Sequence, residues 1–125
     1  MKVRVFISQP MNGLTNEEIL GRRIELIEKF KSFVNPNKTR STRSMDSFEF
    51  IDSFNKDNDI VAKGRIAMLG HSISLMADAD LVIAANGAES SSGCICELTV
   101  AEQYGIFVLH EELIDELMDL MKLIL

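Results

Sequence analysis

Cysteine is scarce in this sequence, and its scarcity argues against a small protein that is stabilised by disulfides or by zinc. Cys94 and Cys96 are the only two cysteines in 125 residues, and one residue separates them. Cysteines at that spacing do not normally form a disulfide, so both thiols are expected to pack in a helix in a reducing compartment. A zinc site would need further ligands, and only His71 and His110 offer soft ones. We therefore expect no metal site, and no motif calls for a cofactor.

Long apolar segments are absent, and acidic residues outnumber basic ones. No apolar run approaches the length of a membrane span, and the N-terminal stretch MKVRVFISQP enters a strand pattern without the apolar core of a signal peptide. The net charge of −6 does not favour non-specific attraction to nucleic acid. We therefore expect a cytoplasmic protein that binds a small molecule, with no membrane and no nucleic acid as partner.

The remaining composition is that of an ordinary globular domain. Hydrophobic residues make up 46% of the chain and charged residues 26%. A chain of 125 residues can bury one core, and neither a repeat nor a second domain is evident. Residues 1–125 are therefore expected to form a single domain.

Strand and helix patterns alternate along the chain. Apolar runs predict strands at residues 2–8, 48–54, 79–85 and 105–110. Apolar residues at helical spacing predict helices at residues 15–35 and 61–77, within 90–106, and at 112–125. This alternation is typical of a doubly wound α/β sheet of four to five mainly parallel strands flanked by helices.

The first helix has a clear start and an expected inner face. Thr15 and Glu18 have the spacing of a capping box. The apolar face is expected to consist of Leu20, Ile24, Ile27, Phe30 and Val34. After this helix, the locally basic segment 36–46, which includes Arg40 and Arg43, is expected to be a loop, and its role is left open.

Ligands of such sheets bind beyond the carboxyl ends of the strands, where the strand order reverses. Three loops would meet there: SQPMNG at residues 8–13, the residues after Ile51, and NGAESSSG at residues 86–93. In the first loop, Gln9 and Asn12 offer uncharged hydrogen-bonding groups, and Gly13 lets a backbone approach closely. These loops are the predicted walls of a binding site.

Glu97 is a carboxylate on the apolar side of its helix. At 100° per residue, Cys94, Leu98 and Ala101 share one stripe, and Glu97 lies between this stripe and the flanking Val100. An ionised carboxylate in a half-buried place costs free energy unless something compensates it, such as the positive end of the helix dipole one turn upstream. Two interpretations remain open: a functional carboxylate, or a side chain that extends from the edge of the stripe to solvent.

A serine-rich turn precedes that helix. Residues 90–93, SSSG, can cap the helix and present hydroxyls and backbone N–H groups to an anion. A simple N-cap would use one serine, whereas three serines before a glycine suit a cradle for a phosphate or a sugar hydroxyl. The predicted cradle and Glu97 would then be neighbours.

Three stretches together carry a family resemblance: ISQPMNGLTNEEI, LGHSISLMADADLVI and GAESSSGCICELTVAEQYGI. They resemble the nucleoside 2-deoxyribosyltransferase-like superfamily, and within it a group of small phage- and bacterial-type domains. The likeness covers most of the chain outside roughly residues 35–60. Its most specific part is the pattern of Ser91, Gly93 and Glu97, preceded by Ala79 and Asp80.

The resemblance implies a flavodoxin-like (Rossmann-like) fold and a nucleoside or nucleotide 2-deoxyribosyltransferase or N-glycoside hydrolase. Glu97 would be the catalytic nucleophile, attacking the anomeric carbon of a 2-deoxynucleoside or its 5′-monophosphate. Another base or water would then resolve the covalent deoxyribosyl-enzyme. The implied substrate-binding residues are Gln9, Asn12, Gly13, Ser72, Gly87, Ser91, Ser92 and Gly93.

Three positions depart from the pattern of the family. Ser72 stands where characterised members usually have an aspartate that orients the base or helps to protonate it, while Ala88 and Ser92 replace a tryptophan and a basic residue of close relatives. These departures support an alternative, a catalytically degraded nucleotide-binding module that uses the same crevice. The broad apolar side of the C-terminal helix predicts a homodimer or higher homo-oligomer, or else an interaction surface.

Overall fold

The computed structural model describes residues 2–36, 47–54 and 57–124. The basic segment around Arg40 and Arg43 lies outside these residues. The described elements follow in the order β1 (Val3–Ser8), α1 (Asn16–Val34), β2 (Phe48–Phe50), α3 (Asn58–Ala62), α4 (Arg65–Met76), β3 (Leu81–Ala84), η1 (Ala88–Ser90), α5 (Ser92–Gln103), β4 (Phe107–His110) and α6 (Glu111–Ile124). None of these helices is long and apolar enough to cross a membrane.

The four described strands form one parallel sheet in the order β2-β1-β3-β4. Val5 is paired with Phe50 on one side and with Leu81 on the other. The strand order reverses between β1 and β3, as in a flavodoxin-like doubly wound fold. The predicted fold class is therefore confirmed.

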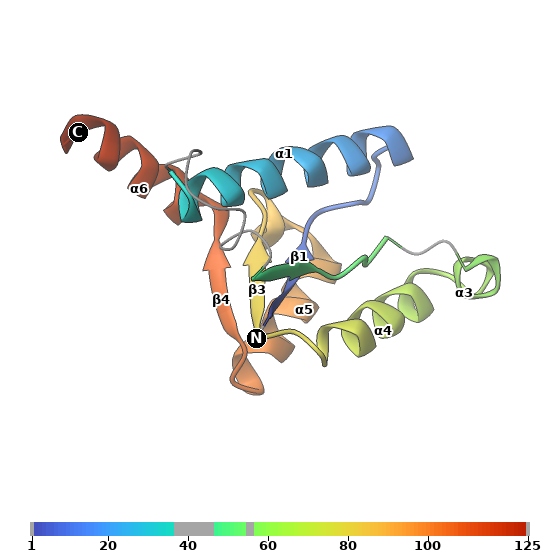
Figure 1. The fold of residues 1–125 in the computed structure, drawn as a ribbon. Helices are drawn as coiled ribbons and strands as arrows, with labels where there is room; N and C mark the ends of the chain where they lie inside the picture. Colours follow the sequence, from blue (N-terminus) through green and yellow to red (C-terminus); the bar gives the residue numbers. More distant parts are fainter. Residues whose placement is uncertain (1, 37–46, 55–56, 125) are drawn as a thin grey trace.

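Helices cover both faces of the sheet (Figure 1). On one face, α1 and α6 pack through Leu26, Phe30 and Ile114 onto the odd-numbered β1 residues Val5 and Ile7. On the other face, α4 and α5 pack onto the even-numbered Phe6 and onto Val82, with Met76 and Ala101 among the buried residues. Because side chains alternate along a strand, Ser8 has the parity of Phe6 and lies on the α4 and α5 face.

The predicted strands are all longer than the observed ones, and two predicted elements end or break at unexpected residues. The strand predicted at residues 48–54 ends at Phe50, because the chain then turns and the Phe54 N–H donates to the Asp52 side chain. The helix predicted at residues 61–77 consists of α3 and α4, separated at Gly64. Gly64 has φ of 98°, a left-handed conformation that breaks the helix and that glycine adopts without strain.

The capping box of α1 is confirmed, but its inner face differs from the prediction. The Glu18 N–H donates to the Thr15 hydroxyl, and the Thr15 N–H donates to the Glu18 carboxylate, each at 3.1 Å. The buried residues of α1 are Ile19, Arg23, Leu26 and Phe30. Ile24, expected inside, is 61% exposed. Apolar residues occupy two neighbouring stripes of α1, and the packing against the sheet selects the stripe that begins with Ile19.

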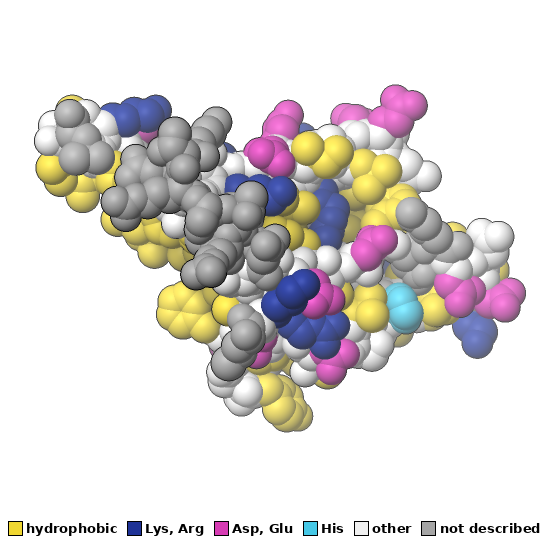
Figure 2. Space-filling model, in the orientation of Figure 1, with side chains coloured by type: hydrophobic (Ala, Val, Ile, Leu, Met, Phe, Trp, Pro, Cys, Tyr) yellow, Lys and Arg dark blue, Asp and Glu magenta, His cyan; other side chains and the backbone are white. Residues whose placement is uncertain are grey.

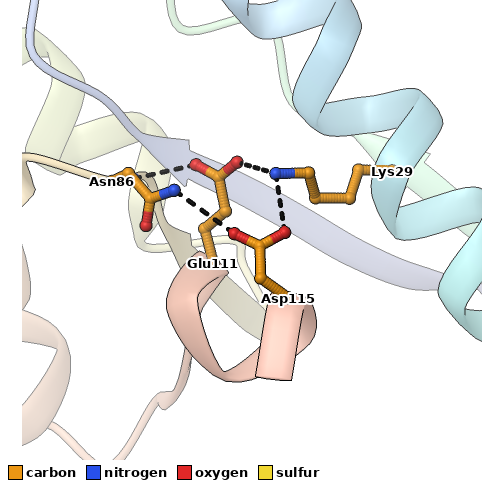
Figure 3. A network of polar contacts seen from close by, with 4 residues as sticks. All are labelled: Lys29, Asn86, Glu111 and Asp115. Carbon is orange, nitrogen blue, oxygen red and sulfur yellow. Dashed lines mark hydrogen bonds and ion pairs between the residues drawn. The ribbon is translucent and has the colours of Figure 1, made fainter. Parts of the chain in front are cut away.

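A charged cluster ties the end of β3 to α1 and α6 (Figure 3). Lys29 Nζ forms ion pairs with Glu111 and Asp115, the latter at 2.9 Å. The other oxygen of Glu111 accepts the backbone N–H of Asn86 at 2.8 Å. Asn86 begins the loop between β3 and α5, so the cluster fixes the start of the loop that leads to Glu97.

Candidate functional site

Glu97 points into the protein, as the helical pattern predicts. Its side chain lies in the middle of α5, whose buried residues are Cys94, Glu97 and Ala101. Glu97 is only 8% exposed. This position excludes the interpretation of a carboxylate that extends into bulk solvent.

One hydroxyl donates a hydrogen bond to the Glu97 carboxylate, and a second influences its pKa. The Ser8 hydroxyl, at the end of β1, donates a hydrogen bond of 2.7 Å to Oε1 of Glu97. Burial raises the pKa of Glu97 above its ordinary value, and the hydroxyls of Ser8 and Ser72 act against this rise by stabilising the ionised form. The carboxylate is therefore partly withdrawn from water and is held by the Ser8 hydroxyl at the end of β1.

A cavity of about 620 Å³ lies next to this carboxylate at the carboxyl edge of the sheet. The cavity is large enough for a nucleoside-sized ligand. Its apolar lining residues are Met11, Ile19, Phe54, Val61, Met68 and Leu69. Its polar and small lining residues are Gln9, Asn12, Gly13, Asn16, Ser53, Asn58, Arg65, Ser72, Ser91, Gly93, Cys94 and Glu97. A cavity that combines apolar walls with polar groups able to orient a ligand is the usual form of a small-molecule site.

The structure brings most of the predicted site residues together. The members that line the cavity with Glu97 are Gln9, Asn12, Gly13, Ser72, Ser91 and Gly93. Ser92 and Gly87 do not line it. Ser92 is exposed on the first turn of α5, one helical step away from Ser91. Gly87 has φ of 89° and packs near Pro10, where its conformation lets the chain turn into η1.

The serine turn supplies the N-cap residue of α5 but no capping hydrogen bond from a side chain. Ser91 is the N-cap residue of α5, and its side chain makes no capping hydrogen bond. Burial raises the pKa of the nearby Cys94 thiol, while hydrogen bonds with the Ser8 and Ser91 hydroxyls lower it. Cys94 is therefore a protonated, buried thiol beside Glu97, and Ser91 lies at the cavity wall.

Four residues that line or support the site were not singled out from the sequence pattern: Ser8, Ser53, Phe54 and Arg65. Ser8 could have been found from strand parity, because the last residue of a central strand with the parity of buried Phe6 faces the same helices. Ser53 and Phe54 belong to the loop after Ile51, which was predicted as a wall of the site, although the strand was also predicted to extend to residue 54. Arg65 follows the unpredicted break at Gly64.

The cavity contains few charged side chains. Among the described lining residues, Glu97 is the sole carboxylate and Arg65 the sole cation. The described part of the chain contains no group of three His, Cys, Asp or Glu side chains placed to hold a metal ion. The arrangement suits a carboxylate that attacks, or stabilises positive charge on, a neutral or weakly charged ligand.

A scan against protein-family models and searches of curated proteins and of solved structures found no match to this chain.

Proposed function

We propose that the protein is a nucleoside or nucleotide 2-deoxyribosyltransferase or N-glycoside hydrolase with Glu97 as its nucleophile. One observation carries the proposal: a buried carboxylate opens into a nucleoside-sized cavity at the carboxyl edge of a doubly wound sheet. The resemblance of Ser91, Gly93 and Glu97 to the nucleoside 2-deoxyribosyltransferase-like superfamily supports the same chemistry. The fold alone does not define a function, whereas the geometry of the site favours this chemistry.

In the proposed reaction, a Glu97 oxygen attacks the anomeric carbon and the N-glycosidic bond breaks. Its electron pair stays with the base, which leaves and takes a proton from water. Water or a nitrogen of a second base then attacks the same carbon, loses a proton and releases Glu97 as a carboxylate. The low solvent exposure of Glu97 strengthens its attraction to the oxocarbenium-like centre, because charges interact more strongly away from water.

The remaining parts of the cavity have matching roles in this proposal. Ser91 and Gly93, at the start of α5, would bind the sugar hydroxyl or a 5′-phosphate. Asn12 and Gly13, in the loop after β1, would line the sugar. Ser8 is a positioning residue, because its hydroxyl donates to the carboxylate, and Ser72 favours the ionised form of Glu97.

Release of free base tests the proposal. The protein is incubated with 2′-deoxynucleosides and their 5′-monophosphates, with and without a second free base, and products are separated by chromatography. We expect base release or exchange that Glu97→Gln abolishes. No release at high protein concentration, or full activity in Glu97→Gln, would exclude the enzyme.

One observation favours a second candidate, a catalytically degraded nucleotide-binding module. Glu97 is the sole carboxylate among the described lining residues, and Ser72 lines the cavity at the position where the family has an acid that would protonate the base. A binding module would show a rise in Tm with nucleotides and no product, because a ligand that binds the folded state stabilises it. The assay and the thermal shift together separate the two candidates.

We also propose that the protein forms a homodimer through α6 and β4. Hydrophobic side chains gather over these two elements at one end of the molecule (Figure 2). The exposed large side chains there include Phe107 at 67% and Leu123 at 85% exposure, besides Leu113, Leu120 and Ile124. Light scattering should show a dimer that Phe107→Glu converts to a monomer; a monomeric parent protein would contradict the proposal.

We also propose that the protein is located in the cytoplasm. Cys94 and Cys96 are both free thiols, which fits a reducing compartment. Fractionation of cells that express a tagged protein would test the location, and recovery outside the cytoplasm would contradict it.

A further inference from the structure

Two residues that line the cavity each carry a buried polar side-chain atom without a hydrogen-bond partner. Within residues 2–36, 47–54 and 57–124, buried side-chain atoms lacking a partner occur on Arg4, Gln9, Arg23 and Ser53. Only two of these residues, Gln9 and Ser53, line the large cavity. Gln9 is 6% exposed and Ser53 is 3% exposed. Because buried polar groups are nearly always hydrogen-bonded, the unpaired oxygens of these two residues point to a polar ligand.

The amide of Gln9 has a fixed orientation. Its Nε2 donates a hydrogen bond of 3.0 Å to the backbone carbonyl of Ile19 in α1. The same bond leaves Oε1 as the unpaired atom of Gln9. An amide oxygen accepts hydrogen bonds and cannot donate them, so its partner must be an N–H or O–H group.

Ser53 is also held in place. The Ile51 N–H donates to the Val5 carbonyl at 2.8 Å, and Arg23 Nη2 donates to the Ile51 carbonyl at 2.6 Å. These two bonds fix the chain two residues before Ser53.

The sheet order separates the two ends of the cavity. Ser91 and Gly93 belong to the β3 side, because α5 follows β3 in the chain. Ser8, which binds Glu97, ends the central strand β1. Ser53 follows β2, on the opposite side of β1 from β3. A ligand whose reacting carbon lies at Glu97 can therefore extend toward Ser91 at one end and toward Ser53 at the other.

We propose that Gln9 and Ser53 bind the nucleobase of a 2-deoxynucleoside through an N–H group of the base; this inference rests on the proposed function. The apolar side chains of Phe54, Met68 and Leu69 line the same cavity and suit a flat heterocycle. Gln9 Oε1 accepts the N–H, and the Ser53 hydroxyl donates to, or accepts from, a neighbouring base atom. The substrate class is thus a nucleoside whose base carries an N–H away from the glycosidic nitrogen.

Pairs of probes that differ in one N–H test this inference. The probes are 2′-deoxyadenosine against purine 2′-deoxyriboside, 2′-deoxycytidine against pyrimidin-2-one 2′-deoxyriboside, and thymidine against N3-methylthymidine. Binding is measured by titration calorimetry on the full chain. For the tightest-binding pair, we expect the probe without the N–H to bind roughly 10- to 100-fold more weakly, because the buried acceptor is then left unpaired.

Substitutions of Gln9 and Ser53 test whether these residues cause the difference in affinity between the two probes. Gln9→Met keeps the length of the side chain but removes the acceptor, so it should bind the two members of that pair with similar affinity. Ser53→Ala should reduce the preference in part. Gln103→Met, on the exposed side of α5, is the matched control and should keep the preference of the parent protein. The comparison of probes on the parent protein needs no variant, so a variant that fails to fold does not remove the test.

The outcomes separate this inference from the proposed function. Equal binding of both members of every pair by the parent protein would overturn the inference, even if free base is released. A clear preference without base release would support recognition by Gln9 and Ser53 and reject the enzyme. A preference that survives Gln9→Met and Ser53→Ala would overturn the assignment to these residues. Absence of binding by every probe at millimolar concentration would overturn both.

Discussion

The Ser8 hydroxyl donates a hydrogen bond of 2.7 Å to Oε1 of Glu97, which joins the first strand to a helix 89 residues later. The bond crosses from the end of the central strand to the helix that follows the neighbouring strand β3. It holds the candidate nucleophile at the point where the strand order reverses. The reactivity of Glu97 in the proposed function therefore depends on the packing of β1 against α5.

Glu97→Gln should lower the rate of the proposed reaction but raise the stability of the fold at neutral pH. Removing the nucleophile should lower the rate of base release by about 10³-fold or more. The pKa of Glu97 is raised in the folded state, so folding favours the protonated side chain. This contribution to stability is complete below the ordinary pKa of 4.5 and is lost as pH rises through the folded pKa. The variant should therefore have a higher Tm than the parent at pH 7 and a similar Tm near pH 4. Glu102→Gln, on the exposed side of α5, should change neither quantity; a lower Tm of Glu97→Gln at pH 7 would contradict the argument.

Ser8→Ala should alter the pH dependence of the proposed reaction. Without the Ser8 hydroxyl, the pKa of Glu97 rises further, so the acidic limb of the kcat/KM profile should move to higher pH. The rate at neutral pH should fall by roughly 10-fold, the usual order of effect of a hydrogen bond to a charged group. Ser90→Ala, an exposed serine of η1, is the control. An unchanged acidic limb would show that Ser8 does not control the ionisation of Glu97.

Lys29→Met should destabilise the junction of α1, α6 and the end of β3. The variant leaves Glu111 and Asp115 without their cation, and we expect a loss of about 1 kcal/mol in urea unfolding at pH 7. Ion pairing with Lys29 lowers the pKa of Asp115, so the contribution of Asp115 is present above its ordinary value of 3.8 and is lost as pH falls through the lower folded pKa. The difference between parent and variant should shrink between pH 7 and pH 3.

The control for this variant is Lys31→Met. Lys31 pairs with Glu28 at 3.6 Å on the exposed surface of the same helix, so its loss should change stability by less than about 0.5 kcal/mol. Equal effects of the two substitutions would show that the cluster around Glu111 contributes no more than a surface ion pair.

Thr15→Ala should weaken the start of α1. The substitution removes the hydroxyl that accepts the Glu18 N–H, and the loss of such a cap costs roughly 1 kcal/mol. Thermal and urea unfolding measure the change. Thr99→Ala is the matched control, because Thr99 is exposed within α5 and its hydroxyl only donates to the Ile95 carbonyl. A loss in Thr99→Ala as large as in Thr15→Ala would argue against the capping explanation.

Local patterns predicted those features that depend on neighbouring residues. The capping box of Thr15 and Glu18 and the inward position of Glu97 follow from helical spacing over a few residues, and the structure confirms both. The face of α1 was predicted less well, because Ile19 and Ile24 belong to two apolar stripes of similar strength. The break at Gly64 was missed, because a single glycine between apolar residues does not by itself end a helical pattern.

The sequence by itself determined the alternation of strands and helices, the parallel doubly wound sheet and the inward side of Glu97, because each depends on the periodicity of apolar residues along a short segment. Only the tertiary structure decided that the Ser8 hydroxyl donates to Glu97 and which side chains of the predicted loops, such as Gln9 and Ser53, line the cavity. These contacts join residues tens of positions apart, and the register between parallel strands, which sets them, depends on the packing of the whole sheet.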